Sequence, residues 1–141
     1  MAAIARSVLA VLTGVVVAAF AVAIVEAISS QIYPLPRGLN AADPVAMREY
    51  IRTLPAGAFV FVLIGWALGT LAGAWTAARL AGHSPQLHGN IVGTLLLGTG
   101  VANMLMLPHP AWVWILGVIT FVAAGYAGGR LAARARPAVS R

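Results

Sequence analysis

The chain has 141 residues, of which 61% are apolar, 9% are charged and none is cysteine. A soluble domain is about 45–50% apolar and about 25% charged, so this composition excludes an ordinary soluble fold. It predicts an integral membrane protein, and at about 20 residues per spanning helix the length allows four spans with short loops. The lack of cysteine also excludes disulfides, thiolate metal sites and cysteine catalysis.

The net charge of +6 comes entirely from arginine, because the chain has nine arginines and no lysine. These arginines flank apolar segments and do not form a basic patch interleaved with stacking aromatic residues, so the pattern does not predict a nucleic-acid interface. Arginines in such positions meet anionic lipid headgroups and orient the spans. The exclusive use of arginine, with abundant alanine and glycine, indicates GC-rich coding and hence a bacterial inner membrane.

The first predicted span covers residues 7–32. It ends at residues 33–38, where Pro34 and Pro36 interrupt helical geometry. Residues 7–25 are 19 consecutive uncharged residues, a run longer than the core of a typical signal peptide. We therefore expect an uncleaved span.

The predicted outer loop, residues 33–54, contains the signature of a short amphipathic helix. Asp43 is a suitable N-cap, and Pro44 suits the first helical position. Apolar and charged residues then follow at helical spacing: Met47, Tyr50, Ile51 and Leu54 on one face, and Arg48, Glu49 and Arg52 between them. Such a helix is expected to lie on the bilayer surface.

The second predicted span covers residues 55–78 and ends before Arg79. The next 50 residues, up to Arg130, contain no ionised side chain and are too many for one crossing. We place a tight turn at residues 107–110, giving spans over 89–107 and 111–129 and a short connection at residues 83–88. The predicted fold is a single all-α transmembrane domain over residues 1–141, a four-helix bundle built from two helical hairpins.

The distribution of arginines predicts the orientation of the spans. Six arginines fall on the side of the termini and three on the other: Arg6, Arg79, Arg130, Arg134, Arg136 and Arg141 against Arg37, Arg48 and Arg52. Because positively charged loops stay in the cytoplasm, both termini are predicted to be cytoplasmic.

Three glycines predict a packing face on the second span. Gly65, Gly69 and Gly73 recur at intervals of four and therefore share one helix face. In lipid, helices associate through close contact at small residues, so this face should meet another helix of the same chain or of a second copy. The other spans carry weaker versions of the pattern: Gly89 with Gly93, and Gly125 with Gly129.

The ends of the second and fourth spans resemble each other. Trp75 precedes Arg79 by four residues, as Tyr126 precedes Arg130, and Leu-Ala follows both arginines. One interpretation is a duplicated hairpin with parallel repeats. The other is that an aromatic ring covers an arginine stem at each cytoplasmic boundary, without common ancestry.

Glu26 is the only ionisable acid inside a predicted span, which makes it a candidate functional residue. It precedes Tyr33 by seven residues, a depth of about 10 Å, and Asn103 precedes Pro108 by five residues, a depth of about 8 Å from the same surface. We expect Glu26 and Asn103 to face the bundle interior and to hydrogen-bond, with Thr99 or Thr120 as further candidates to join them.

Ser29 and Ser30 follow Glu26 at helical spacing and extend this polar cluster outward. The carboxyl group of Glu26 then has three interpretations: an anchor between helices, a proton or cation site open to the periplasm, or a group that reaches outward to water. His109 is expected to be an exposed turn residue at the mouth of the cluster. One Glu and one His are too few ligands for a metal centre.

Trp66 is predicted to pack near mid-bilayer, and a lipid or quinone-like ligand beside it is a further hypothesis without a specific motif. No nucleophile motif, haem-ligand pair or phosphate-binding loop occurs in the sequence. The sequence therefore predicts no catalytic residue, no cofactor and no enzymatic activity.

The arrangement resembles small four-helix bacterial inner-membrane proteins of unassigned function. The resemblance covers nearly the whole chain and is carried by Glu26, the turn at 33–38, Leu54 followed by Pro55, and Gly65-Trp66 followed by Gly69 and Gly73. It implies the topology and no mechanism. Small multidrug resistance transporters also have four spans and a glutamate in the first, but theirs lies mid-span. Nothing here is similar to the Thr/Ser/Phe-rich motif of small fluoride channels.

Two functions compete. The first is a non-enzymatic scaffold or accessory subunit that contacts membrane lipids or a larger membrane complex. The second is a homodimeric proton- or cation-coupled transporter that uses Glu26. A single four-helix bundle fills its own centre with side chains, so a transporter would require the homodimer.

Overall fold

The computed structural model describes residues 1–135, which form five α-helices and no strand. The helices are α1 (Ala2–Ile32), α2 (Pro44–Thr53), α3 (Ala56–Ala81), α4 (Pro85–Met106) and α5 (Ala111–Arg134). All except α2 are long and apolar enough to cross a membrane. The predicted all-α architecture with four long apolar helices is therefore confirmed. Arg136 and Arg141, which we assigned to the side of the N-terminus, lie outside the described residues.

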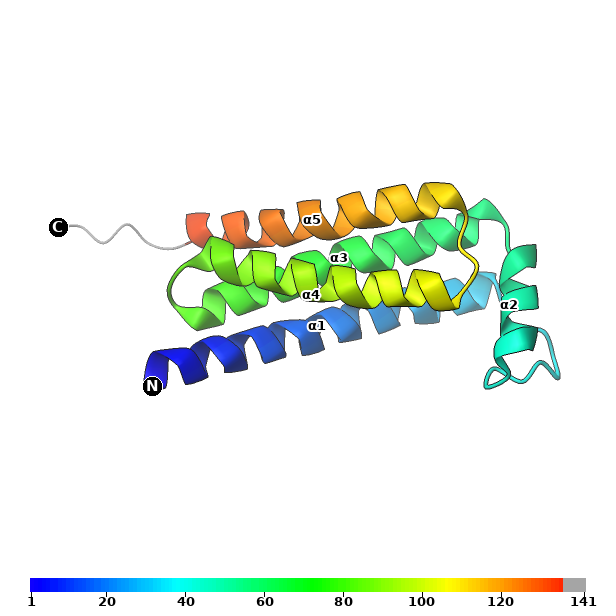
Figure 1. Ribbon diagram of the computed structural model, residues 1–141, viewed down its shortest axis with the longest axis horizontal. Coiled ribbons are helices and arrows are strands. Elements are labelled where there is room, and N and C mark those ends of the chain that lie inside the picture. Colours follow the sequence, from blue (N-terminus) through cyan, green and yellow to red (C-terminus); the bar gives the residue numbers. More distant parts are fainter. Residues whose placement is uncertain (136–141) are drawn as a thin grey trace.

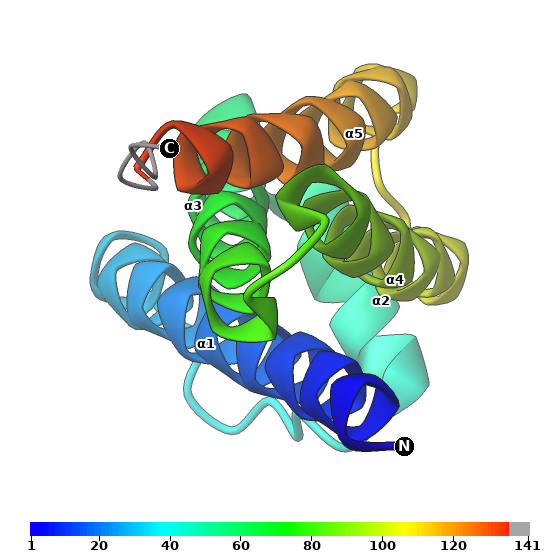
Figure 2. The same cartoon turned by 90° about the vertical axis from the view of Figure 1, so that its left-hand side faces the viewer.

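The four long helices run antiparallel in succession (Figure 1). Helix α3 is central and contacts α1, α4 and α5, while α4 and α5 also pack on each other (Figure 2). Helix α1 packs mainly on α3 and touches α4 only slightly. The start of α1 and the end of α5 lie at one end, which we call the N-terminal end. The short helix α2 lies across the other end, which we call the α2 end.

Two predicted boundaries differ from the structure at the N-terminal end. The connection predicted at residues 83–88 is shorter, because α3 continues to Ala81 and α4 already begins at Pro85. Gly82 ends α3 in the left-handed conformation, with φ of 77°, and Pro85 suits the first turn of α4. Helix α5 likewise continues beyond residue 129 to Arg134, since arginine is a good helix former.

Helix α2 forms where the sequence predicts it. Asp43 caps it through Oδ1, which accepts hydrogen bonds from the backbone N–H groups of Val45 (2.9 Å) and Ala46 (3.4 Å). Its apolar residues, including Ile51 and Tyr50, pack on the core cluster at the end of the bundle. The amphipathic pattern of α2 is thus accounted for by packing on the chain's own core.

The glycines of α3 bring its backbone against α1 of the same chain. A Cβ atom on Gly69 would lie 2.9 Å from the carbonyl oxygen of Ala18, and one on Gly73 would overlap the carbonyl oxygen of Gly14. Gly65 faces Val25 further along the same interface. At Gly69 and Gly73 the α3 backbone lies directly against the α1 backbone, a close approach that the missing glycine side chains permit.

A second glycine contact joins α4 to α5. A Cβ atom on Gly89 would lie 2.8 Å from Cα of Gly129, and one on Gly93 would lie 3.0 Å from Cα of Gly125. The two glycine pairs that the sequence marks as weaker patterns therefore face each other across one helix crossing. The two helical hairpins are completed by contacts within one chain.

Candidate functional site

A cavity of about 260 Å³ opens at the α2 end between α1, α2, α3 and α4. Its polar lining contains all four residues of the predicted intramembrane cluster, together with further side chains from the loop and α2: Glu26, Ser29, Ser30, Tyr33, Tyr50, Asn103 and His109. The structure thus brings residues from both hairpins around one space. The depth count from the sequence predicts similar depths for Glu26 and Asn103, and both residues line this cavity.

The predicted hydrogen bond between Glu26 and Asn103 is wrong. Both side chains are exposed at the cavity, and no hydrogen bond joins them in the described part of the chain. Helix α1 packs mainly on α3 and touches α4 only slightly, so helix packing does not hold the two side chains against each other. Thr99 does not join the cluster either, since its hydroxyl donates to the carbonyl of Leu96 (2.8 Å), and Thr120 does not line the cavity.

His109 is half-buried, which corrects the expectation of an exposed turn residue. Its ring lies edge-on to Phe59, with 5.8 Å between centroids, and 6.1 Å from the ring of Trp66. Nδ1 lies 3.0 Å from the carbonyl oxygen of Leu107, and because a carbonyl oxygen only accepts, this hydrogen bond requires the tautomer with the proton on Nδ1. The turn between α4 and α5 therefore folds the imidazole back onto the bundle.

Tyr50 is a cavity residue that the sequence marked only as part of an apolar face. Its hydroxyl lies 3.3 Å from the carbonyl oxygens of both Tyr33 and Pro34, which share its single proton as acceptors. This contact ties α2 to the end of α1 across the cavity. A tyrosine hydroxyl on an otherwise apolar helix face usually needs a hydrogen-bond partner, and this requirement could have identified Tyr50 as a cavity residue.

The cavity ends at the ring of Trp66, which is 7% exposed and packs 5.0 Å from the ring of Phe121. Beyond these rings, Ala74, Ala77 and Val92 fill the centre of the bundle and are fully buried. Trp66 packs in the core, as the sequence predicts. The cavity at the α2 end, which has both polar and apolar walls, therefore does not extend through the packed centre of the bundle.

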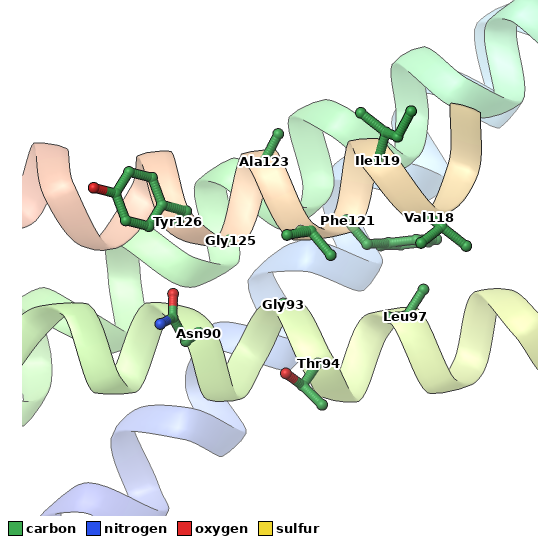
Figure 3. Close-up of a pocket in the computed structure, with 11 residues that line it drawn as sticks. Asn90, Gly93, Thr94, Leu97, Val118, Ile119, Phe121, Ala123, Gly125 and Tyr126 are labelled. Carbon is green, nitrogen blue, oxygen red and sulfur yellow. The ribbon is translucent and has the colours of Figure 1, made fainter. Parts of the chain in front are cut away.

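A second, larger space of about 670 Å³ is a lateral groove between α4 and α5 (Figure 3). Gly93 and Gly125 line it where the two helices approach each other, and Asn90 and Tyr126 lie toward its N-terminal end. The amide of Gln86 donates to Asn90 Oδ1 (2.9 Å) and to the carbonyl of Tyr126 (3.2 Å), so these polar groups are already engaged. The rest of the lining is mainly apolar and suits a hydrocarbon chain.

At the N-terminal end, two arginines pack over aromatic rings. The guanidinium carbon of Arg79 lies 5.8 Å from the ring centroid of Trp75, and that of Arg130 lies 5.9 Å from the centroid of Tyr126. Both distances fit a cation–π contact within one helical turn. This geometry agrees with the interpretation that an aromatic ring covers an arginine stem at each of these two boundaries.

His83, in the connection between α3 and α4, and His88, in the first turn of α4, form a pair with 5.0 Å between ring centroids. His83 also lies 3.2 Å from the hydroxyl of Ser7. Within residues 1–135, no three side chains of His, Cys, Asp or Glu gather in a way that could hold a metal ion.

No family model, no curated protein and no solved structure matches this chain. The secondary structure and the apolar composition of the helices define its class: in residues 1–135 it is a small all-helical protein whose four long helices are compatible with membrane insertion.

Proposed function

We propose that the chain is a multi-pass protein of the bacterial inner membrane that acts as a non-enzymatic scaffold or accessory subunit. The observation that carries this proposal is the closed interior of the bundle. The cavity reaches the ring of Trp66, which packs on Phe121, and fully buried small residues fill the centre of the bundle beyond these rings. A single copy of such a bundle offers a surface for other molecules and no passage through itself.

The exposed apolar surface of α1 supports a role in contacting lipid or a larger membrane complex. Large apolar side chains are exposed at every fourth position along its whole length: Ile4, Val8, Leu12, Val16, Phe20, Ile24, Ile28 and Ile32. Lipid tails can surround these apolar side chains directly, and the same side chains can also pack on an apolar helix of another subunit.

The chemistry of the cavity supports a non-enzymatic role. The hydroxyl of Ser30 donates to the carbonyl of Ala27 in its own helix (2.8 Å), and within residues 1–135 no serine hydroxyl donates to the carboxylate of Glu26. A hydroxyl becomes a nucleophile when a neighbouring base accepts its proton, which this arrangement does not provide.

Native mass spectrometry of gently extracted protein tests the scaffold proposal. We expect complexes that contain one copy of this chain, alone or with a different membrane protein and retained lipid. A homodimer as the sole species would contradict the proposal, because it would supply the second bundle that a transporter requires.

The second candidate function is a homodimeric proton- or cation-coupled transporter, and the exposure of Glu26 in a polar cavity with Ser29, Ser30 and Asn103 favours it. Proton flux into liposomes under an imposed potassium gradient separates the two functions. Under the scaffold proposal, liposomes with the wild-type chain, Glu26→Gln and the surface control Glu49→Gln leak protons equally. A proton flux that is present with the wild type and Glu49→Gln but absent with Glu26→Gln would establish the transporter and overturn the scaffold proposal.

The proposed orientation places both termini in the cytoplasm and the loop before α2 in the periplasm. The chain contains no cysteine, so single-cysteine variants report one position each. Ala42→Cys should react with a membrane-impermeant maleimide in spheroplasts, whereas Ala3→Cys should react only after the membrane is permeabilised. Both alanines are exposed in the structure, so burial does not confound the comparison. The opposite labelling pattern would reverse the orientation.

A further inference from the structure

A separate pocket of about 350 Å³ lies at the α2 end, beside the cavity that contains Glu26. Its walls come from α2, from the last residues of α4, from the turn between α4 and α5 and from the first turn of α5. Arg48 and Arg52 supply positive charge, and no acidic side chain lines the pocket in the described part of the chain. Leu107 and His109 line both spaces and thus belong to the wall that the pocket shares with the Glu26 cavity.

The two arginines stand one helical turn apart, so both reach the same side of α2. Nε of Arg48 donates to the carbonyl oxygen of Met106 at the end of α4 (3.0 Å), which fixes the guanidinium at the pocket wall. This bond uses one of the five N–H donors of a guanidinium and leaves the others available. Arg52 is exposed beside it. A pair of guanidinium groups matches the oxygens of a phosphate group, because each can donate two parallel hydrogen bonds.

Other groups at the pocket add to its preference for an anion. Trp114 lines the pocket and carries an indole N–H donor. Helix α5 begins at Ala111, close to His109 in the chain, and no side chain caps its N-terminus. The partial positive charge of that helix end adds to the charge of the two arginines.

The pocket is amphiphilic. Leu105 and Met106 line it and are 71% and 66% exposed, which places apolar surface directly beside the guanidinium groups. A free inorganic ion would gain nothing from contact with these apolar side chains. A lipid would place its headgroup against the arginines and the start of its acyl chain against these two residues.

We propose that this pocket binds the phosphate headgroup of an anionic lipid. The inference rests on the proposed membrane location of the chain, and it holds for the scaffold and the transporter alike. The pocket would hold the phosphate at the bilayer surface next to, and separate from, the carboxyl group of Glu26.

Lipid binding to the full chain in detergent micelles, measured by native mass spectrometry, tests the proposal. The probe is phosphatidic acid, compared with phosphatidylcholine, in which a choline group shields the phosphate. We expect the double variant Arg48→Gln/Arg52→Gln to bind phosphatidic acid about tenfold more weakly than the wild type, since it loses charge-assisted hydrogen bonds. Phosphatidylcholine binding should be unchanged.

The chain offers a matched control. Arg130 and Arg134 are also one turn apart and exposed, but they lie at the N-terminal end on α5. Arg130→Gln/Arg134→Gln removes the same charge and should leave the binding of phosphatidic acid within about twofold of wild type. Equal losses in the two double variants would show a general charge effect and overturn the proposal, as would no loss in either.

Two further measurements keep the result interpretable. Arg52→Gln alone preserves the contact of Arg48 with α4, so a loss of binding in this variant reflects the pocket and not a displaced α2. An excess of inorganic phosphate should leave the lipid bound, and displacement of the lipid would overturn the lipid assignment. Because the measurement uses micelles, its failure is distinguishable from a wrong orientation, which the cysteine labelling detects.

Discussion

Gly73→Val is expected to lower the free energy of unfolding by about 1–3 kcal/mol, because it inserts a side chain between two backbones in contact. A Cβ atom at this position would overlap the carbonyl oxygen of Gly14 and lie 2.9 Å from Cβ of Ala18. Neither atom belongs to a flexible side chain, so relief requires α1 and α3 to move apart. Unfolding in mixed micelles with increasing dodecyl sulfate, followed by circular dichroism, measures the change.

Gly98→Val is the matched control for this prediction. Gly98 is also in the middle of a long apolar helix, but no atom lies within 4 Å of the Cβ that would be added. Its substitution should change the free energy of unfolding by no more than about 0.5 kcal/mol. Equal destabilisation by both variants would mean that the loss comes from introducing valine into a helix and not from the contact between α1 and α3.

The glycine spacing shows how far the sequence could predict the packing. Intervals of four from Gly65 to Gly73 identify the face, because residues at this spacing lie on one side of a helix. The partner was not predictable in the same way, since any helix with a small-residue stripe can meet such a face. The structure selects α1, where Gly14 and Ala18 provide the complementary surface.

For the candidate site, the sequence likewise predicted the depth of the residues but not the contacts between them. Counting the helical rise from the turns gives depth, and Glu26 and Asn103 do lie around one cavity. Depth carries no information about the order of helices around the bundle, so the hydrogen bond predicted between them is wrong. His109 was misplaced because its two flanking prolines indicate a turn without indicating whether the ring points to solvent or back to the core.

The boundaries at the N-terminal end show a third limit. Charged residues mark where a segment leaves hydrocarbon, but the helical hydrogen bonds continue until the backbone geometry changes. Helix α5 therefore extends through Arg130 to Arg134, while α3 ends only where Gly82 adopts a positive φ. Hydropathy predicts the limits of a span and not those of the helix that contains it.

Trp66→Ala should be the most destabilising single substitution in the core, with an expected loss of about 3–5 kcal/mol in the free energy of unfolding. The indole contacts Phe121, and a Cβ atom on Gly117 would lie 2.8 Å from its ring, so α5 packs directly on it. The same ring ends the polar cavity, and its removal would extend that cavity into the bundle and hydrate it. The dodecyl sulfate titration measures the stability, and hydrogen exchange of the amides in α5 measures the access of water.

Trp75→Ala serves as the control, because Trp75 occupies the same helix but is 43% exposed and packs over Arg79. Its loss removes a surface cation–π contact worth about 0.5–1 kcal/mol and leaves the core intact. Trp66→Phe keeps an aromatic ring against Phe121 and should retain part of the stability that Trp66→Ala loses. If Trp66→Ala were no more destabilising than Trp75→Ala, the ring would not close the cavity, and the closed interior on which the scaffold proposal depends would have to be abandoned.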